Sequence, residues 1–477
     1  MTVVQNKLKN RYTESVQQNK ELFQHLRIKY LAKNLPSSLH KIIDNCDIQL
    51  HLENVIDSDH SQIKNKSLNW GNTSFHLKYR IRELSDLLKL VPEMQLKKNE
   101  IDRIIRGGYI LSILPLNLLL PTEVLRQFLP PIDFAQPHPL KDIDPYGITS
   151  SKLVKNDIWF ASQKFDHTVL MNIHGHCPIG CSDCYKSFYV RERGHENDLG
   201  AGNPFEEQPS NLEKQTKILV NWLNSNPQVY DVIISGGEPL IRPNSHLKVM
   251  LRVFEKAKFL KVLRICTGTI FLGLPFRIDD ELLNILEEFS DKTGVRITFQ
   301  AHLSNHFQIT PEAIIAVHKI RKKGFSIYSQ TPIKEGVNFF SHDIEKTKNF
   351  WIELSKLQFM VGVDPYKFII DMHPRTLSYY VPIELIIKVW SDVYESHNFP
   401  ELERPKTISI LCKEGNIQLS GHSLFSIHKE VDIKSKIVTY YIPTLFREKP
   451  FVYQEPLSEF NKDSKSLDTL KRKRQRK

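Results

Sequence analysis

The stretch Thr168-Val-Leu-Met-Asn-Ile-His-Gly-His-Cys-Pro-Ile-Gly-Cys-Ser-Asp-Cys184 joins a short apolar run to three closely spaced cysteines. The run from Thr168 to Ile173 predicts a buried strand, because it is rich in aliphatic residues and contains no turn signal. The C-x3-C-x2-C spacing predicts a tight loop directly after that strand. Thiolates gathered on one short loop are typical of a metal or cluster site, so Cys177, Cys181 and Cys184 are the candidate metal ligands.

The number of thiols in this loop bears on the kind of site. Three thiolates without a fourth fit an iron-sulfur cluster whose last iron is left open for a small molecule. Structural zinc requires four ligands, usually supplied as two pairs. His174 and His176 are close enough in sequence to provide a fourth zinc ligand, so zinc remains an alternative, as does a set of unrelated thiols. The spacing favours the open cluster.

From about residue 165 the sequence alternates short β-branched runs with amphipathic helical segments. Six such units in series predict an α/β fold with parallel strands and right-handed crossovers, either a partial barrel or a doubly wound sheet. The expected strands are 168–173, 231–235, 261–266, 295–300, 325–330 and 366–371, and the expected helices are 212–223, 245–257, 279–289, 311–323, 342–357 and 383–395.

Residues suited to ligand binding stand at the end of each expected strand. In both candidate folds the active site lies at the carboxyl ends of the strands, so we expect these residues to share one mouth. In strand order they are the cysteine loop, Gly236-Gly237-Glu238-Pro239, Thr267-Gly268-Thr269, His302, Gln330 and Asp371.

An open iron in an α/β barrel needs an exogenous ligand, and S-adenosylmethionine belongs to the cofactors that begin radical chemistry. The chain resembles the radical S-adenosylmethionine superfamily, whose members carry three cysteines at this spacing early in a partial (β/α)6 barrel. The resemblance implies a 4Fe-4S cluster on Cys177, Cys181 and Cys184, and reductive cleavage of S-adenosylmethionine to a 5'-deoxyadenosyl radical that abstracts hydrogen from the substrate. It also implies an electron donor such as flavodoxin or ferredoxin.

Within that superfamily, about residues 69–445 resemble the lysine 2,3-aminomutases. The segment Asn226-Pro-Gln-Val-Tyr-Asp-Val-Ile-Ile-Ser-Gly-Gly-Glu238 is similar to a segment of that family. The resemblance implies a small amino-acid-like substrate, whose carboxylate faces Lys186 and whose distal ammonium is held by Asp371. Asp371 also suits a simpler role as a carboxylate that caps a loop. The implied S-adenosylmethionine pocket consists of Gly236, Gly237, Glu238, Thr267, His302 and Gln330.

One stretch, Thr407-Ile-Ser-Ile-Leu-Cys-Lys-Glu-Gly-Asn-Ile-Gln-Leu419, departs from the family. The aminomutases carry there the lysine that binds pyridoxal phosphate, whereas an ungapped match places Gln418 at that position and Leu411 at a second substrate aspartate. An amide cannot form an aldimine. The sequence therefore predicts a radical enzyme without pyridoxal phosphate. The alternative is a pyridoxal phosphate-dependent aminomutase with a relocated lysine such as Lys413, although the glycine run that would bind phosphate is missing.

Composition limits the remaining classes of protein. The chain has 477 residues, an apolar fraction of 40% and a net charge of +11, of which the segment Lys471–Lys477 carries six positive charges. A run of this kind is typical of a solvated tail, and no RNA-recognition signature accompanies it, so we expect no nucleic-acid partner. A non-catalytic metal-binding protein whose tail adheres to RNA is the alternative from a different class. The remaining cysteines, Cys46, Cys266 and Cys412, are interpreted as ordinary buried thiols.

The two ends and the pattern of hydrophobicity predict location and domains. Met1–Lys20 lacks the apolar stretch of a secretory signal, and the longest apolar segment, Tyr109–Pro121, is too short to span a bilayer, which predicts a cytoplasmic protein without membrane contact. The expected parts are an N-terminal helical and polar extension (1–68), a helical pre-barrel segment (69–164), the (β/α)6 core (165–396) and a C-terminal segment with a basic disordered tail (397–477).

Overall fold

The structure is a computed structural model, and it describes part of the chain. The predicted site residue Asp371, the cysteine Cys46, the candidate amine Lys413 and the basic tail 471–477 lie outside the described residues. The described residues are 23–24, 26–35, 39, 69–94, 96, 98, 101–102, 111–129, 158, 160–181, 184, 186, 209–370, 380–394, 401–412, 415–419, 426–443 and 449–462.

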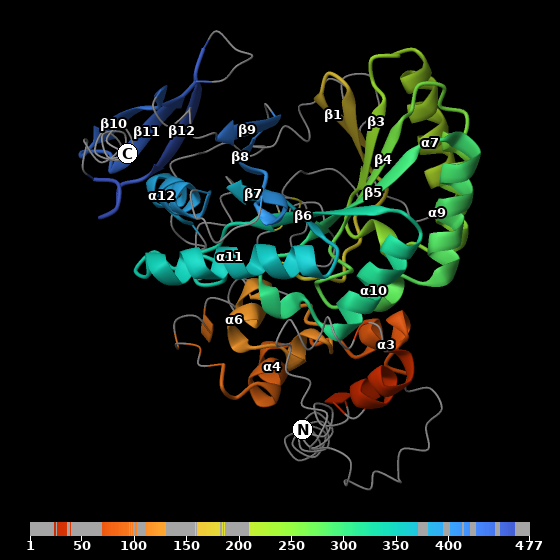
Figure 1. Cartoon of the computed structure of the whole chain (residues 1–477), viewed down its shortest axis with the longest axis horizontal. Helices are drawn as coiled ribbons and strands as arrows, with labels where there is room; N and C mark the ends of the chain where they lie inside the picture. The colour runs from red at the N-terminus through yellow and green to blue at the C-terminus, as the bar shows by residue number, and fades with distance from the viewer. Residues whose placement is uncertain are drawn as a thin grey trace, which may run out of the picture.

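A curled nine-stranded sheet forms the centre of the molecule, with its strands in chain order (Figure 1). Strands β2 to β8 are parallel, while β1 at one edge and β9 at the other are antiparallel to their neighbours. The strands are β1 (Ala161–Phe165), β2 (Thr168–Asn172), β3 (Asp231–Ser235), β4 (Val262–Thr267), β5 (Arg296–His302), β6 (Ser326–Pro332), β7 (Asp364–Ile370), β8 (Thr407–Cys412) and β9 (Gly415–Leu419).

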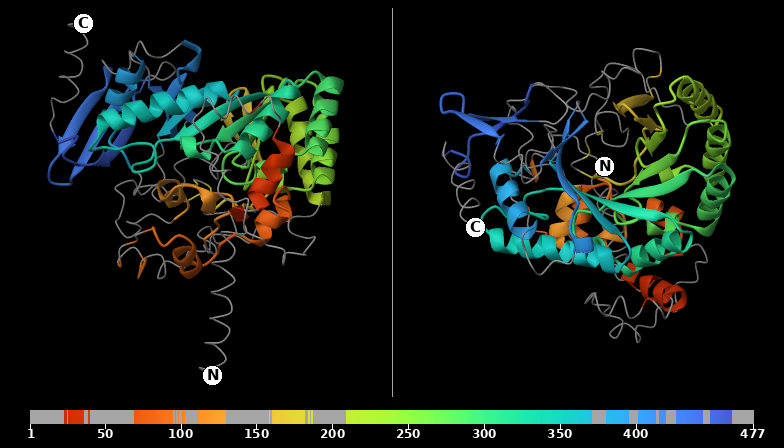
Figure 2. Two further views of the ribbon diagram at one scale, coloured as in Figure 1. Left: turned by 60° about the horizontal axis from the view of Figure 1, so that its bottom comes forward. Right: turned by 45° about the horizontal axis from the view of Figure 1, so that its top comes forward.

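Each pair of consecutive parallel strands is connected through one of the expected α-helices, all six of which are confirmed. Because every new strand is added on the same side of the last one, right-handed crossovers bring all of these helices to one face of the sheet. Figure 2 shows them along the outer side of the curled sheet, which is the arrangement of a half-barrel and not of a doubly wound sheet. The helices are α7 (Pro209–Asn224), α8 (Asn244–Phe254), α9 (Asp280–Thr293), α10 (Pro311–Lys322), α11 (Ile344–Met360) and α12 (Ile383–Tyr394).

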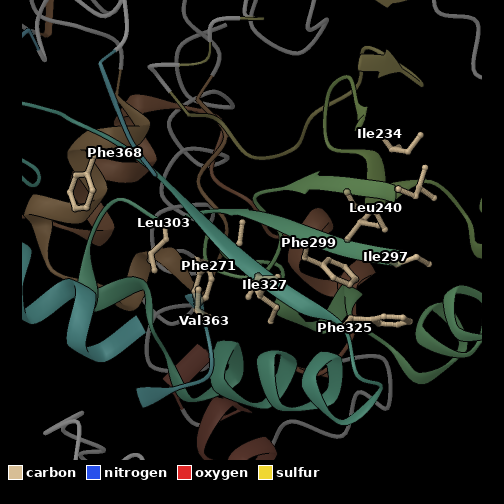
Figure 3. Close-up of a cluster of buried hydrophobic side chains, with 14 of the residues drawn as sticks. Ile234, Leu240, Phe271, Ile297, Phe299, Leu303, Phe325, Ile327, Val363 and Phe368 are labelled. Atoms are coloured by element: carbon tan, nitrogen blue, oxygen red, sulfur yellow. The ribbon is translucent and has the colours of Figure 1, made fainter. Parts of the chain in front are cut away.

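Alternating burial along the strands separates the core from the concave side of the sheet. In β6, Ile327 and Ser329 are buried, whereas Tyr328 and Gln330 are half-buried on the opposite face. The strand periodicity of two produces this alternation. Figure 3 shows Phe299 and Ile327 among the apolar side chains of the core between the sheet and its helices.

The structure extends the predicted fold at both edges of the sheet. All six expected strands are confirmed, and β8 is a seventh parallel strand that pairs with β7. Together with β9 it forms a hairpin in which Ser409 pairs with Gln418. The resemblance associates this stretch with a cofactor lysine, and its described residues, 407–412 and 415–419, are strands of the sheet. A separate antiparallel sheet follows, made of β10 (His428–Asp432), β11 (Ile437–Ile442) and β12 (Phe451–Pro456).

A second hydrophobic core lies under the cysteine loop. Ile179 and Cys181 of the loop pack in it with side chains of the preceding segment, such as Ile113 and Leu116. The described helices of that segment are short: α3 (Thr73–Lys78), α4 (Leu84–Leu90), η1 (Asn117–Leu119), α6 (Thr122–Leu125) and η2 (Arg126–Phe128). In the described part of the chain, no helix is both long and apolar enough to cross a membrane.

Candidate functional site

A cavity of about 260 Å³ lies on the concave side of the sheet, at the carboxyl-terminal halves of its parallel strands. Its walls come from strands β1 to β9 and from the loop that follows β2. Every predicted site residue that the structure describes lines this cavity: Cys177, Cys181, Cys184, Lys186, Gly236, Gly237, Glu238, Thr267, His302 and Gln330.

The cysteine loop and the glycine turn after β3 are joined by their backbones. The amide of Gly237 donates to the carbonyl oxygen of His174 at 2.7 Å, and the amide of Glu238 donates to that of His176 at 2.9 Å. These bonds extend the β2–β3 pairing beyond the strand ends. The turn therefore holds the start of the cysteine loop at the edge of the cavity.

This close approach explains the two glycines. Gly236 has φ of +126°, a conformation that side chains rarely adopt. A Cβ atom at Gly236 would lie 2.4 Å from the carbonyl oxygen of His174, and one at Gly237 would lie 1.9 Å from that of His176. The sequence pattern predicts that the glycines bring backbone groups close to a ligand. In the structure these glycines bring two loops into contact.

Glu238 is a buried carboxylate with three protein donors. Its Oε1 accepts hydrogen bonds from Thr267 Oγ1 at 2.7 Å and from the amide of Leu240 at 3.2 Å, and its Oε2 accepts one from the amide of Gly268 at 2.7 Å. Burial raises the pKa of Glu238 to about 7, although these hydrogen bonds and the charge of Arg277 act in the opposite direction. A positive charge bound nearby would therefore stabilise the deprotonated form of Glu238.

Lys186 is buried at the base of the cysteine loop. Its ammonium donates to Asn172 Oδ1 at 3.1 Å, to the carbonyl oxygen of Gly236 at 3.2 Å, and to Ser235 Oγ. These contacts join the ends of β2 and β3 to the loop. Burial lowers the pKa of Lys186 to about 8. The side chain lines the cavity, and the structure adds this bridging position.

The three thiols of the loop face the same cavity. Burial raises the pKa of Cys177 well above its ordinary value, and neighbouring negative groups add to this effect, namely Glu238, Cys184 and Cys181. Among the described residues, no three His, Cys, Asp or Glu side chains are grouped so that they could bind one metal ion. A four-iron cluster bonds each thiolate through a separate iron, so its ligands surround a volume and do not meet at one point.

Residues distant in the sequence support the loop from both sides. Ser112 Oγ donates to the carbonyl oxygen of Pro178, and the amide of Gly180 donates to that of Ser112 at 3.3 Å. Arg242 Nη2 donates to the carbonyl oxygen of Ile173 at 3.2 Å. No local sequence signal marks Ser112 or Arg242, because their role depends on which loop lies beside them.

His302 and Gln330 are neighbours across the β5–β6 pairing. They are register partners, and the amide of Leu303 donates to the carbonyl oxygen of Gln330 at 3.1 Å. His302 Nε2 lies 3.0 Å from Ser304 Oγ. Both side chains are half-buried and line the cavity, as the strand-end rule predicts.

Several cavity residues were missed by reasoning from the sequence. The sequence interprets Cys266 and Cys412 as ordinary buried thiols. Cys412 is buried and Cys266 is half-buried, but both line the cavity, and Cys266 Sγ donates to Gln300 Oε1 at 3.1 Å. Burial raises the pKa of Cys266 to about 11. Arg264 and Lys367 line it too. Cys266 and Arg264 lie on β4 and Lys367 lies on β7. The period-two alternation of these two strands is the sequence signal that could have placed the three side chains on the concave face.

The fold and site define an α/β half-barrel with a cysteine-lined cavity at its strand ends. No protein-family model matches the chain. In sequence it is similar to a protein of Aquifex aeolicus (strain VF5) named "Putative L-lysine 2,3-aminomutase", with 28% identity over 225 residues, which cover 46% of this chain and 54% of that protein.

Two proteins that carry the plain name L-lysine 2,3-aminomutase are also similar. The one from Buchnera aphidicola subsp. Baizongia pistaciae is 22% identical over 238 residues, covering 50% of this chain and 61% of its own length. The one from Haemophilus influenzae is 24% identical over 223 residues, covering 47% and 57%. These likenesses support a lysine 2,3-aminomutase-like family, and the matched region spans little more than half the length of each of these relatives.

Proposed function

We propose that the protein is a radical S-adenosylmethionine enzyme of lysine 2,3-aminomutase type, acting on a small amino-acid-like substrate without pyridoxal phosphate. The observation that carries the proposal is the convergence of Cys177, Cys181 and Cys184 with Glu238 on one cavity at the strand ends. The names of the sequence relatives support the same class of enzyme.

The donor set suits a 4Fe-4S cluster with one open iron. The loop offers three thiols to a shared cavity, and the second core packs beneath them at Ile179 and Cys181. Burial makes bare thiolates costly, so positive iron ions in contact with the sulfur atoms would stabilise the deprotonated ligands. When bound, the cluster and S-adenosylmethionine would supply a 5'-deoxyadenosyl radical for hydrogen abstraction.

The chain's own residues would orient the cofactor. Glu238 is held rigidly by Thr267 and Gly268, and its buried charge favours a cationic partner such as the amino group of S-adenosylmethionine. Farther along the concave face, His302 and Gln330 provide hydrogen-bonding groups to the remainder of the cofactor. A cofactor and substrate bound against these walls would displace water, so that a reactive primary radical meets its intended C–H bond.

The hairpin of β8 and β9 supports a reaction without pyridoxal phosphate. Gln418 is exposed and is not among the cavity-lining residues, whereas Leu411, Cys412 and Asn416 of the same hairpin are. The position that the resemblance matches to the cofactor lysine therefore offers no amine to the cavity. If a relocated lysine binds pyridoxal phosphate, the purified protein will show an aldimine absorbance that borohydride makes permanent.

Anaerobic reconstitution with iron and sulfide tests the proposal. The wild-type protein should bind about four irons per chain with the broad visible absorbance of a cluster, and should release 5'-deoxyadenosine from S-adenosylmethionine upon reduction. Cys181→Ala should lose both properties. Cys412→Ala is the matched control, because it removes a thiol from the same cavity without touching the loop, and it should keep the cluster.

Two results would overturn the proposal. One is zinc without iron or sulfide in the reconstituted protein. The other is formation of 5'-deoxyadenosine by Cys181→Ala at the wild-type rate, which would show that the loop is not the site of cofactor cleavage.

A further inference from the structure

The charges on the concave wall point to a particular class of substrate. We propose that the cavity binds an acidic substrate, a small dicarboxylic amino acid, whose distal carboxylate pairs with Lys367 on β7. This inference rests on the proposed function and names the substrate class of the same site.

Among the described side chains that line the cavity, positive charges outnumber negative ones. Among the described residues that line it, Glu238 is the one carboxylate, and it is held by Thr267 and Gly268 at the glycine turn. The cationic side chains in the lining are Lys164, Lys186, Arg264 and Lys367.

Two of these cations have strong protein partners. Lys186 donates to Asn172, Ser235 and Gly236. Arg264 forms a bidentate pair with Asp231, with Nε at 2.8 Å from Oδ1 and Nη2 in contact with Oδ2. The charge of Arg264 is therefore already paired with a carboxylate, and the ammonium of Lys186 already donates to three neutral oxygens.

Lys367 differs from these two cations in its partners. Its side chain is buried, at 9% exposure, yet its ammonium has no acidic or hydrogen-bonding partner among the described residues. Its Nζ lies 5.3 Å from the centre of the Tyr366 ring. A buried ammonium without a partner is costly, and burial together with the charge of Arg264 lowers the pKa of Lys367 to about 8, with Cys266 acting in the opposite direction. An incoming carboxylate would relieve this cost.

The surroundings of Lys367 suit a short ligand with a charged end. Lys367 is the register partner of Gln330, and Gln330 is the partner of His302, so these side chains form one row across the concave face. Beyond it, Ile369 and Leu411 make the wall apolar. An apolar wall beside Lys367 suits the methylene groups of a short substrate whose carboxylate reaches this ammonium. The distal ammonium of a lysine-like substrate would instead meet a like charge there.

Equilibrium dialysis against reconstituted enzyme with S-adenosylmethionine tests the inference, using L-glutamate, its neutral analogue L-glutamine, and L-lysine as probes. We expect L-glutamate to bind most tightly. Lys367→Met should weaken L-glutamate binding by about tenfold or more, the usual value of one charge-assisted hydrogen bond, while Lys367→Arg keeps most of it. Lys388→Met, which neutralises an exposed lysine of α12, is the control and should bind as the wild type does.

Iron content and substrate-free release of 5'-deoxyadenosine are measured on the same samples, and they report on the proposed function separately. The substrate inference fails if these remain normal and L-lysine binds more tightly than L-glutamate, if no probe binds, or if Lys367→Met binds L-glutamate unchanged. It also fails if borohydride fixes added pyridoxal phosphate to Lys367, which would make this residue an imine-forming lysine. Loss of cluster and of 5'-deoxyadenosine in the wild type counts against the proposed function instead.

Discussion

Gly237 lies against His176 so closely that an added Cβ atom would be 1.9 Å from the carbonyl oxygen of His176. That same oxygen accepts the amide of Glu238 at 2.9 Å. The contact joins two loops that are separated by about sixty residues in sequence, and it places Glu238 beside the cysteines.

We therefore expect Gly237→Ala to separate the glycine turn from the cysteine loop. Backbone atoms cannot move aside as a flexible side chain can, so the variant should lose most of its iron after reconstitution. Gly294→Ala is the control. Gly294 ends α9 with φ of +69° and has open space around its Cβ position, so its cost should be limited to about 1 kcal/mol of backbone strain. Normal iron content in Gly237→Ala would contradict the close packing of the two loops.

Lys186→Met is expected to lower iron content and substrate-free formation of 5'-deoxyadenosine together. The reason is that the ammonium bridges Asn172 and Gly236 beneath the loop, and a thioether cannot donate these bonds. Lys388→Met controls for the loss of one lysine. If the variant keeps its cluster and only weakens binding of an amino-acid substrate, Lys186 acts as the contact to the substrate carboxylate that the family resemblance implies.

Glu312→Gln should loosen the N-terminal helical segment from the half-barrel. Glu312 on α10 accepts Arg27 Nε at 2.7 Å, Arg27 Nη2 at 3.1 Å and Trp70 Nε1 at 3.2 Å. Loss of the charge leaves Arg27 without its partner, at an expected cost of about 2 kcal/mol in the free energy of unfolding, because Arg27 is partly exposed. Urea unfolding measures this, with Glu288→Gln on the surface of α9 as the control; equal stability of both variants would refute the expectation.

Because of Glu312, we also expect the protein to lose stability in acid. Burial would raise the pKa of Glu312, but the charge and hydrogen bonds of Arg27 and the bond from Trp70 bring it below the ordinary 4.5. The unfolded chain then takes up its proton first as the pH falls. This contribution to stability is complete above pH 4.5 and disappears as the pH drops through the lower folded value. Glu312→Gln should show a smaller loss of stability below that pH than the wild type.

A second buried carboxylate, Glu455, should lower the stability of the protein as the pH rises. Glu455 on β12 accepts Tyr440 Oη at 2.8 Å and Asn461 Nδ2 at 2.7 Å, and burial raises its pKa to about 7. The folded protein therefore holds a proton that the unfolded chain releases near 4.5, so stability should fall as the pH rises from 4.5 toward 7. Glu455→Gln should flatten this part of the profile. An unchanged profile in that variant would assign the effect to other groups.

The positions of the main helices and strands could be predicted from local patterns in the sequence. Strands such as β3 and helices such as α9 are visible in the spacing of apolar residues, because each buries one side of a regular backbone. The C-x3-C-x2-C spacing marks the candidate cluster loop, and the rule that ligands bind at strand ends predicted that Glu238, His302 and Gln330 share a site. In the structure these side chains do line one cavity.

The tertiary structure alone decided what surrounds those residues. Local sequence does not reveal that Ser112 holds the cysteine loop, that the β8–β9 hairpin brings Cys412 to the cavity, or that Lys367 has no acidic partner there among the described residues. These contacts join residues far apart in the chain, and they depend on strand register and on the curling of the sheet, which bring distant side chains together. The sequence by itself thus predicted a loop of three closely spaced cysteines at Cys177, Cys181 and Cys184, whereas the fold decided which charged side chains line the cavity beside that loop.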